Sequence, residues 1–258
     1  MSLVEDVEYL DILSFEDHHT GIYSISFDDN PILTVIIGAK CSDGIVLIAD
    51  RKYTDVRTGN GDFGEKIFGD AAHFLIEFTG KYSAFDIFRK YIFGDILIRK
   101  DYTFFNAINR SCNLVKKFNE SIYPTGPKFE VLTALHRRKD SELHCIDVKG
   151  EDETVTHYKA IGSGKKTADI FCKKLEHSNI TMKDFTKHAF LAIMYMKEYC
   201  PGLGVGVESD GGVPDIKYLS YDEEWDHPPP LQDILEFKEY TTEKLDQFKR
   251  SFDAILKE

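Results

Sequence analysis

The sequence lacks the marks of secreted, membrane-spanning and zinc-binding proteins. None of its 258 residues belongs to an apolar run approaching the ~18 residues that a membrane-spanning helix needs. No basic residues precede an apolar segment at the N-terminus, so no secretory signal is predicted. The five cysteines are widely spread, without a CxxC or Cys/His cluster, and their odd number fits reduced thiols. We therefore expect a cytoplasmic protein with no metal and no other cofactor.

Lysine and arginine are also absent from the first 31 positions. This segment holds eight acids and no Lys or Arg, so it contributes −8 of the net charge of −12. Nucleic acids and anionic membranes are bound by basic surfaces, so we expect neither as a partner. Residues 1–33 are predicted to be an acidic leader or propeptide, with one strand over residues 22–27.

The rest of the chain is patterned as alternating groups of strands and helices. Strands over residues 34–38 and 45–49 form a predicted hairpin, and the polar segment 51–64 is predicted to be a loop. Further strands are predicted over residues 74–78, 130–136, 142–148, 155–161, 203–207 and 216–219. Helices are predicted over residues 83–99, 102–121, 165–175 and 182–199. This order suits two packed sheets with helices on both outer faces, or an ordinary α+β domain.

The domain of residues 34–221 is followed by a Pro-rich linker and a C-terminal helix over residues 222–258. Three consecutive prolines at 228–230 exclude helix and central strand. The apolar face predicted for the helix consists of Leu231, Ile234, Leu235, Leu245, Phe248, Phe252 and Ile255. We expect this face to pack on the chain's own domain or on a neighbouring subunit.

Three polar residues lie sixteen positions apart at the ends of apolar runs: Thr34, Asp50 and Lys66. A threonine hydroxyl is a poor nucleophile at neutral pH and needs a base together with a nearby cation. A lysine held by an aspartate is such a cation. The equal spacing alone is weak support, because 44 acids and 32 bases will produce such a set by chance.

The sequence around these three residues is more specific. The stretch TVIIGAKCSDGIVLIADRKYT, followed by GEKIFGD and HFLIEFTG, resembles the N-terminal core of 20S proteasome subunits. These are N-terminal nucleophile hydrolases and their inactive relatives, and the resemblance covers residues 32–207. It implies an α+β fold, a four-layer αββα sandwich of two packed antiparallel sheets flanked by helix pairs.

The resemblance also implies roles for single residues. Thr34 falls on the family's nucleophile, and Asp50 and Lys66 fall on its two charged partners. Ser163, in the sequence AIGSG, falls on the active-site serine; without the resemblance it is a helix cap before Lys165. In active members the nucleophile is the first residue of the mature chain, and its α-amine is the general base.

Substrate-binding residues follow from the same resemblance. Thr54 and Gly80 fall on residues that bind the substrate backbone as an added strand, and the Gly80 N–H group would stabilise the oxyanion. Phe78 is expected to line the pocket for the residue before the scissile bond. The implied substrate is a peptide or an unfolded protein, and the implied partners are other subunits or copies of this chain in a ring.

Several residues depart from the pattern of active members. Leu33 replaces the glycine that usually precedes the nucleophile, and Glu198 and Pro201 replace an Asp and a Ser of the family. The nitrogen of Thr34 is an amide unless the leader is removed, and an amide is no base. Two functions therefore stay open. One is a threonine endopeptidase of protein degradation, processed before Thr34, whose acyl chemistry ends in hydrolysis or ligation. The other is a non-catalytic ring subunit, as α-type subunits are.

Overall fold

The computed structural model describes residues 34–54, 61–69, 74–79, 104–122, 128–135, 141–175, 179–207, 212–222 and 227–255. The strand predicted over residues 22–27 and the helix predicted over residues 83–99 lie outside these ranges. No helix in the described part of the chain is long and apolar enough to cross a membrane.

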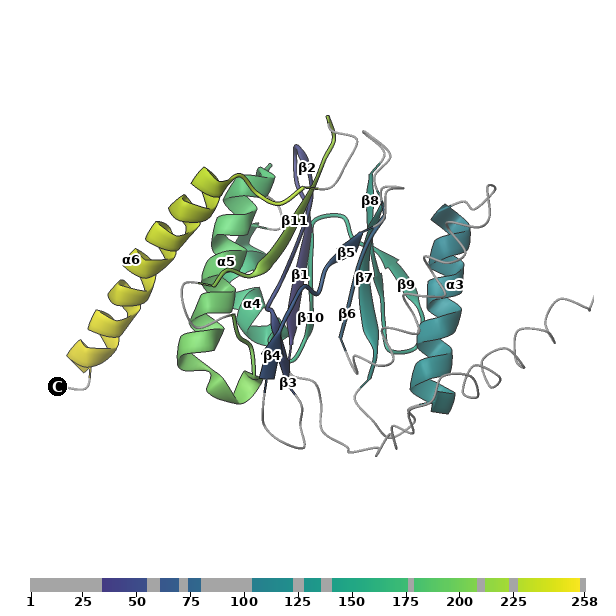
Figure 1. The fold of residues 1–258 in the computed structure, drawn as a ribbon, viewed down its shortest axis with the longest axis horizontal. Helices are drawn as coiled ribbons and strands as arrows, with labels where there is room; N and C mark the ends of the chain where they lie inside the picture. Colours follow the sequence, from purple (N-terminus) through teal and green to yellow (C-terminus); the bar gives the residue numbers. More distant parts are fainter. Residues whose placement is uncertain are drawn as a thin grey trace, which may run out of the picture.

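Two antiparallel sheets pack face to face between layers of helices (Figure 1). The first sheet has the order β10-β1-β2-β11, made by Tyr158–Gly162, Val35–Lys40, Gly44–Ala49 and Asp215–Ser220. The second has the order β5-β6-β7-β8-β9, made by Phe68–Gly69, Phe74–Thr79, Glu130–Leu135, Glu142–Ile146 and Asp152–Thr154. The predicted pair of packed antiparallel sheets is confirmed.

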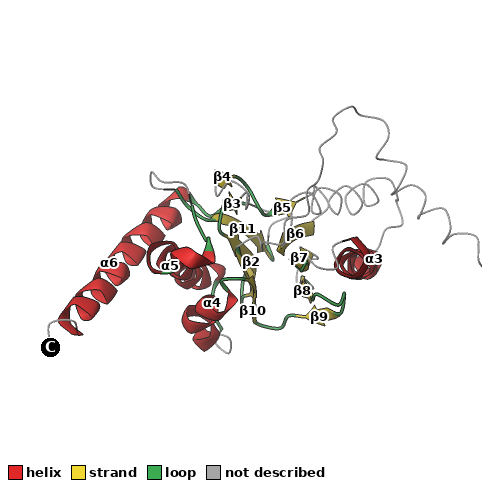
Figure 2. Cartoon of the chain, turned by 90° about the horizontal axis from the view of Figure 1, so that it is seen from below, coloured by secondary structure: helices red, strands yellow, loops and turns green. Residues whose placement is uncertain are grey.

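Helices cover the outer face of each sheet, as Figure 2 shows from a second direction. Beside the first sheet lie α4, α5 and α6, made by Lys165–Cys172, Met182–Tyr199 and Leu231–Ile255. Beside the second sheet lies α3, Phe104–Lys117, which continues into a π-helical turn at Phe118–Ile122. These layers confirm the predicted αββα sandwich.

The central strands are apolar on both faces because each sheet is covered on both sides. In β2, Val46 and Ile48 pack toward the helices, whereas Ile45 and Leu47 pack into the core between the sheets, and all four are fully buried. Strand β1 follows the same pattern, so the hairpin of β1 and β2 runs through the middle of the molecule. This hairpin carries Thr34 and Asp50 at its end, so the core holds the site rigidly.

The strand predictions were wrong in three places. Residues 51–64 are not only a loop, because β3 (Lys52–Thr54) pairs with β4 (Gly61–Phe63). The strand predicted to begin at residue 155 begins only at Tyr158, since residues 155–157 connect β9, which ends at Thr154 on one sheet, to β10 on the other.

The strand predicted over residues 203–207 does not form. Pro201–Leu203 is a short 3₁₀ helix, and Gly204 has a left-handed backbone with φ 61°. The backbone of Gly206 then bonds to neighbouring loops, because its N–H group donates to Asp50 and its carbonyl accepts from the Arg51 N–H group. These groups are therefore used at the candidate site and not in a sheet.

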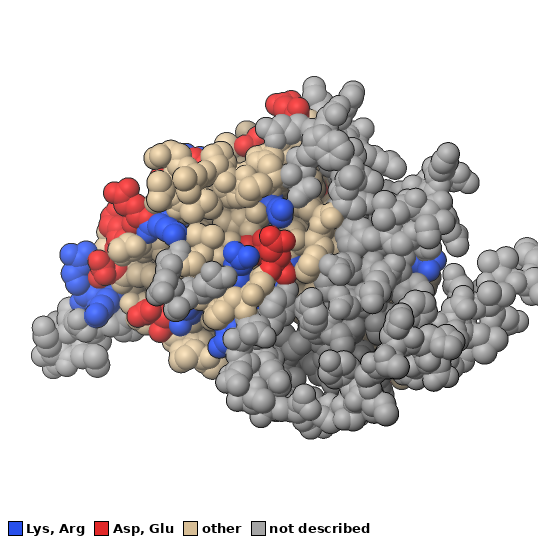
Figure 3. All heavy atoms as spheres, viewed as in Figure 1, with Lys and Arg blue, Asp and Glu red and all other residues tan. Residues whose placement is uncertain are grey.

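The C-terminal helix α6 packs on α5 of its own chain. Lys183 of α5 bonds Asp233 at 2.9 Å and Glu236 at 2.7 Å. The predicted apolar face is only partly right, since Leu231 and Leu235 are exposed while Phe237, absent from that face, is fully buried. On the face drawn in Figure 3, basic and acidic side chains are interspersed over α6, at the left of the view.

Candidate active site

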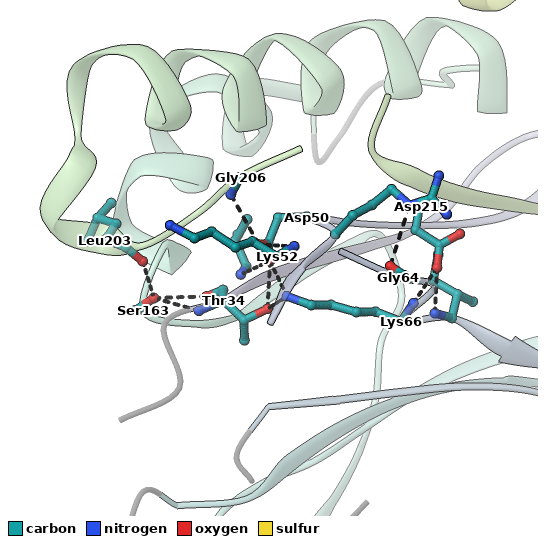
Figure 4. A network of polar contacts seen from close by, with 12 residues as sticks. Thr34, Asp50, Lys52, Gly64, Lys66, Ser163, Leu203, Gly206 and Asp215 are labelled. Atoms are coloured by element: carbon teal, nitrogen blue, oxygen red, sulfur yellow. Dashed lines mark hydrogen bonds and ion pairs between the residues drawn. The ribbon is translucent and has the colours of Figure 1, made fainter. Parts of the chain in front are cut away.

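Thr34, Asp50 and Lys66 meet in one buried cluster (Figure 4). The Thr34 hydroxyl donates to Asp50 Oδ1 at 2.7 Å, and Lys66 Nζ donates to Thr34 Oγ1 at 2.7 Å. Lys66 Nζ also lies 2.7 Å from Asp50 Oδ1 as an ion pair. The three exposed fractions are 2%, 0% and 3%, so solvent screens none of these contacts. The structure thus brings these three residues together.

Local strand pairing brings the first two of them together. Ile36 of β1 faces Ala49 of β2 in the antiparallel register, so Thr34 and Asp50 lie at the same end of the hairpin. The Asp50 N–H group donates to the Val35 carbonyl, and the Val35 N–H group donates to Asp50 Oδ1 at 3.1 Å. The backbone thus orients the Asp50 carboxylate toward the Thr34 hydroxyl.

The second oxygen of the Asp50 carboxylate is also bonded. Asp50 Oδ2 accepts from the backbone N–H groups of Lys52 and Gly206, each at 3.2 Å. A buried carboxylate is tolerated when a cation and several donors surround it. Asp50 has both, so it can hold the Lys66 ammonium against the threonine oxygen.

Asp215 holds the backbone of Lys66, and sequence reasoning did not find it. Asp215 Oδ2 accepts from the N–H groups of Lys66 at 2.5 Å and of Ile67 at 2.8 Å. Burial raises the pKa of Asp215, and these two N–H groups oppose that rise. Asp215 is 149 residues from Lys66 and begins β11, so no local sequence signal points to this contact.

Ser163 bonds the backbone of Thr34 on the side away from Lys66 (Figure 4). The Thr34 N–H group donates to Ser163 Oγ at 3.0 Å, and the Ser163 hydroxyl lies 3.0 Å from the Thr34 carbonyl and 3.3 Å from the Leu203 carbonyl. Ser163 does not cap α4, whose N-cap is Gly164 without a side-chain bond. The Ser163 hydroxyl therefore lies next to the Thr34 nitrogen, which removal of the leader would convert into a free amine.

Gly162 permits this close approach between β10 and Thr34. Its φ is 87°, and a Cβ atom there would lie 2.5 Å from the Thr34 carbonyl oxygen. We expect Gly162→Ala to lower the free energy of unfolding by about 1–3 kcal/mol, because it combines a left-handed backbone with a clash against backbone. Urea denaturation measures this change.

The matched control is Gly202→Ala, because a Cβ at Gly202 would meet no atom within 4 Å. Equal losses of stability in Gly162→Ala and Gly202→Ala would contradict the close approach described here.

Of the three predicted substrate-binding residues, the structure describes the side chain of Phe78 alone. Phe78 is buried on the α3 side of β6, where its ring lies 5.3 Å from that of Phe129. Gly80 and the side chain of Thr54 lie outside the described residues. Glu198 and Pro201, which replace an Asp and a Ser of the resembled family, are exposed. The substrate-binding roles of Thr54, Phe78 and Gly80 stay predictions.

Across the described ranges, no three His, Cys, Asp or Glu side chains come together as a metal site. The chemistry available at the cluster is that of a hydroxyl held between an ammonium and a carboxylate. Such an arrangement polarises the hydroxyl, and an amine at the Thr34 nitrogen would add a general base.

Comparisons with known proteins identify the family. The sequence profile of the proteasome subunit family matches residues 34–208. Anbu (ancestral beta-subunit) from Yersinia bercovieri shares the fold with a TM-score of 0.67 and 13% identity, over 85% of this chain and 97% of that chain. A Gly-1 mutant of Anbu from Hyphomicrobium sp. strain MC1 gives 0.65 and 16% identity, with the same coverage of both chains. A search of curated proteins finds no match. Since the profile covers more than half of the sequence, the chain belongs to the proteasome subunit family.

Proposed function

We propose that this chain is a threonine endopeptidase subunit that becomes active when it is cut before Thr34. One observation carries the proposal: Thr34 Oγ1 lies 2.7 Å from both Lys66 Nζ and Asp50 Oδ1 in a buried cluster. An ammonium at that distance stabilises negative charge developing on the hydroxyl oxygen. A structural ion pair would need only Lys66 and Asp50, so the inclusion of the hydroxyl supports a nucleophilic role.

The freed α-amine of Thr34 would be the general base. An α-amine has a pKa of about 8, and a nearby ammonium lowers that pKa toward the working pH. The amine would accept the hydroxyl proton while Thr34 Oγ1 bonds to the substrate carbonyl carbon. The peptide C–N bond then breaks, the proton passes to the leaving amine, and an ester on Thr34 is left. Water hydrolyses this ester, or an amine acceptor takes the acyl group in a ligation.

Ser163 supports the reaction through the Thr34 backbone. Its hydroxyl lies 3.0 Å from both the nitrogen and the carbonyl oxygen of Thr34. In the processed chain, this contact orients the amine toward the hydroxyl of the same residue. We further propose that Thr54 and Gly80 bind the substrate backbone, and that Gly80 supplies an oxyanion donor.

The proposed site acts within an assembly. Subunits of the proteasome family generally form rings, and we propose copies of this chain or related subunits as its partners, with peptides or unfolded proteins as substrates. The alternative is a non-catalytic ring subunit. The exposed positions of Glu198 and Pro201, where the family has polar active-site residues, favour that alternative.

A pair of proteins that differ by one residue tests the proposal. A cleavable N-terminal fusion can release one chain beginning at Thr34 and a control chain beginning at Leu33. Only the first has a free amine on the nucleophile, so we expect it alone to cleave a fluorogenic peptide and to form an ester with an acylating inhibitor. If the two chains are equally inactive after assembly is confirmed by light scattering, the non-catalytic alternative holds.

A further inference from the structure

Glu77 is a buried carboxyl group that the proposed mechanism does not use. Strand β6 directs Ile76 and Phe78 toward α3, so Leu75 and Glu77 face the other sheet. The cross-strand neighbour of Glu77 is Leu132, which lies in the same core between the sheets. Glu77 is 0% exposed, and within the part of the chain that the structure describes neither of its carboxyl oxygens has a hydrogen-bond partner.

Three charged groups of the site act on Glu77 from three different elements. They are Lys66, which precedes β5, Asp50, which follows β2, and Asp215, which begins β11. Burial raises the pKa of Glu77 well above its ordinary value of 4.5; Asp215 and Asp50 raise it further, and Lys66 opposes them. Among the described residues that act on Glu77, two carboxyl groups therefore stand against one lysine.

Hydrogen bonds decide which carboxyl group carries a proton. Asp50 accepts from Thr34, Lys66 and three backbone N–H groups. Asp215 accepts from two backbone N–H groups. Bonds donated to a carboxylate favour its charged form, and a buried carboxylate without them is costly. Glu77 has none in the described structure, so it is the member of the set on which a negative charge is least stabilised.

We propose that Glu77 is a positioning residue which carries a proton at neutral pH and thereby leaves the Lys66 ammonium to Thr34 and Asp50. An ionised Glu77 would add another negative charge that acts electrostatically on Lys66. Such a charge would also favour the protonated form of a free Thr34 amine. A protonated amine cannot act as a base. This catalytic consequence rests on the proposed function of Thr34, whereas the proton on Glu77 does not.

Unfolding equilibria of the full chain test for the proton without any assay of activity. The unfolded chain ionises Glu77 near its ordinary value, while the folded chain retains the proton, so the stability given by the buried neutral form is lost as pH rises. The unfolding constant of the wild type, divided by that of Glu77→Gln, should therefore rise up to tenfold per pH unit above about pH 5. Glu130→Gln, at a half-buried position on β7, controls for the loss of one acid. A ratio for Glu77→Gln that stays constant from pH 5 to pH 8 overturns the proposal.

Infrared spectroscopy of the wild type gives a second, independent measurement. At pH 7 the wild-type minus Glu77→Gln difference spectrum should contain the carbonyl stretch of a protonated carboxyl group. A difference spectrum with carboxylate bands alone contradicts the proposal, and Glu77→Leu serves as reference if Glu77→Gln does not fold.

The positioning role is tested on the chain that begins at Thr34. The kcat of the wild type should fall at the alkaline pH at which Glu77 ionises, whereas Glu77→Gln should retain its kcat to higher pH with little change in KM. Coinciding pH profiles would overturn the positioning role. If the chain beginning at Thr34 is inactive, the proposed function fails, and the unfolding and infrared measurements still decide whether Glu77 carries a proton.

Discussion

Thr34→Ala is expected to abolish both removal of the leader and peptide cleavage, while the fold survives. A single hydroxyl is asked to attack the preceding carbonyl during processing and the substrate carbonyl afterwards. Deleting a covalent nucleophile costs up to about 10⁶-fold in kcat. The structural cost is smaller, about 0.5–1.5 kcal/mol for the lost hydrogen bonds, because Lys66 and Asp50 stay paired. Peptide hydrolysis, intact mass and urea denaturation measure the three effects.

Two variants control for this result. Thr34→Ser keeps a hydroxyl at the same position and should retain measurable cleavage, and Thr154→Ala removes an exposed threonine from β9. Peptidase activity that persists in purified Thr34→Ala would show that Thr34 is not the nucleophile. Processing that continues in this variant would show that another protease removes the leader.

Lys66→Ala is expected to abolish activity and to destabilise the fold. Its side chain is 3% exposed, and its ammonium lies 2.7 Å from the fully buried Asp50 carboxylate. Removal of one member leaves the other charge buried and unpaired, which typically costs about 3–5 kcal/mol. Lys165→Ala, at an exposed position on α4, is the matched control and should change stability little. Urea denaturation of both variants measures the difference.

The double variant Asp50→Ala/Lys66→Ala isolates the pair itself. Because no unpaired charge is left in that variant, its loss of stability should be smaller than the sum of the two single losses. Additive losses would mean that the two groups do not interact in solution. A Lys66→Ala protein that unfolds at the same urea concentration as the wild type would likewise contradict the buried pair.

The predictions from sequence were most accurate where the contacts are local. Apolar runs on both sides of the turn at residues 42–44 indicate a hairpin, and the antiparallel register of β1 and β2 then places Thr34 beside Asp50. The tail helix shows the limit of such patterns. Helical spacing placed Leu231 on the apolar face and left out Phe237, but the position of α5 decides that Phe237 is buried and Leu231 is exposed.

Contacts over long sequence separations were not predictable from one sequence. Gly206 bonds Asp50 across 156 positions and Asp215 bonds Lys66 across 149, and neither has a periodic pattern that marks it. The failure at residues 203–207 has the same origin. An apolar, glycine-containing stretch suggested a strand, yet its backbone donates to the carboxylate of Asp50 and accepts from Arg51 instead.

The sequence by itself determined the chemical groups of the site, the hairpin that presents two of them and the family of the fold, because these follow from residue types and short-range pairing. Only the tertiary structure decided how Lys66 is held and which carboxyl group shares its surroundings. Asp215 reaches it from β11, and Glu77 lies between the sheets without a hydrogen-bond partner in the part of the chain that the structure describes. Burial and hydrogen bonding set the charge of such groups, and both arise only when the two sheets pack together.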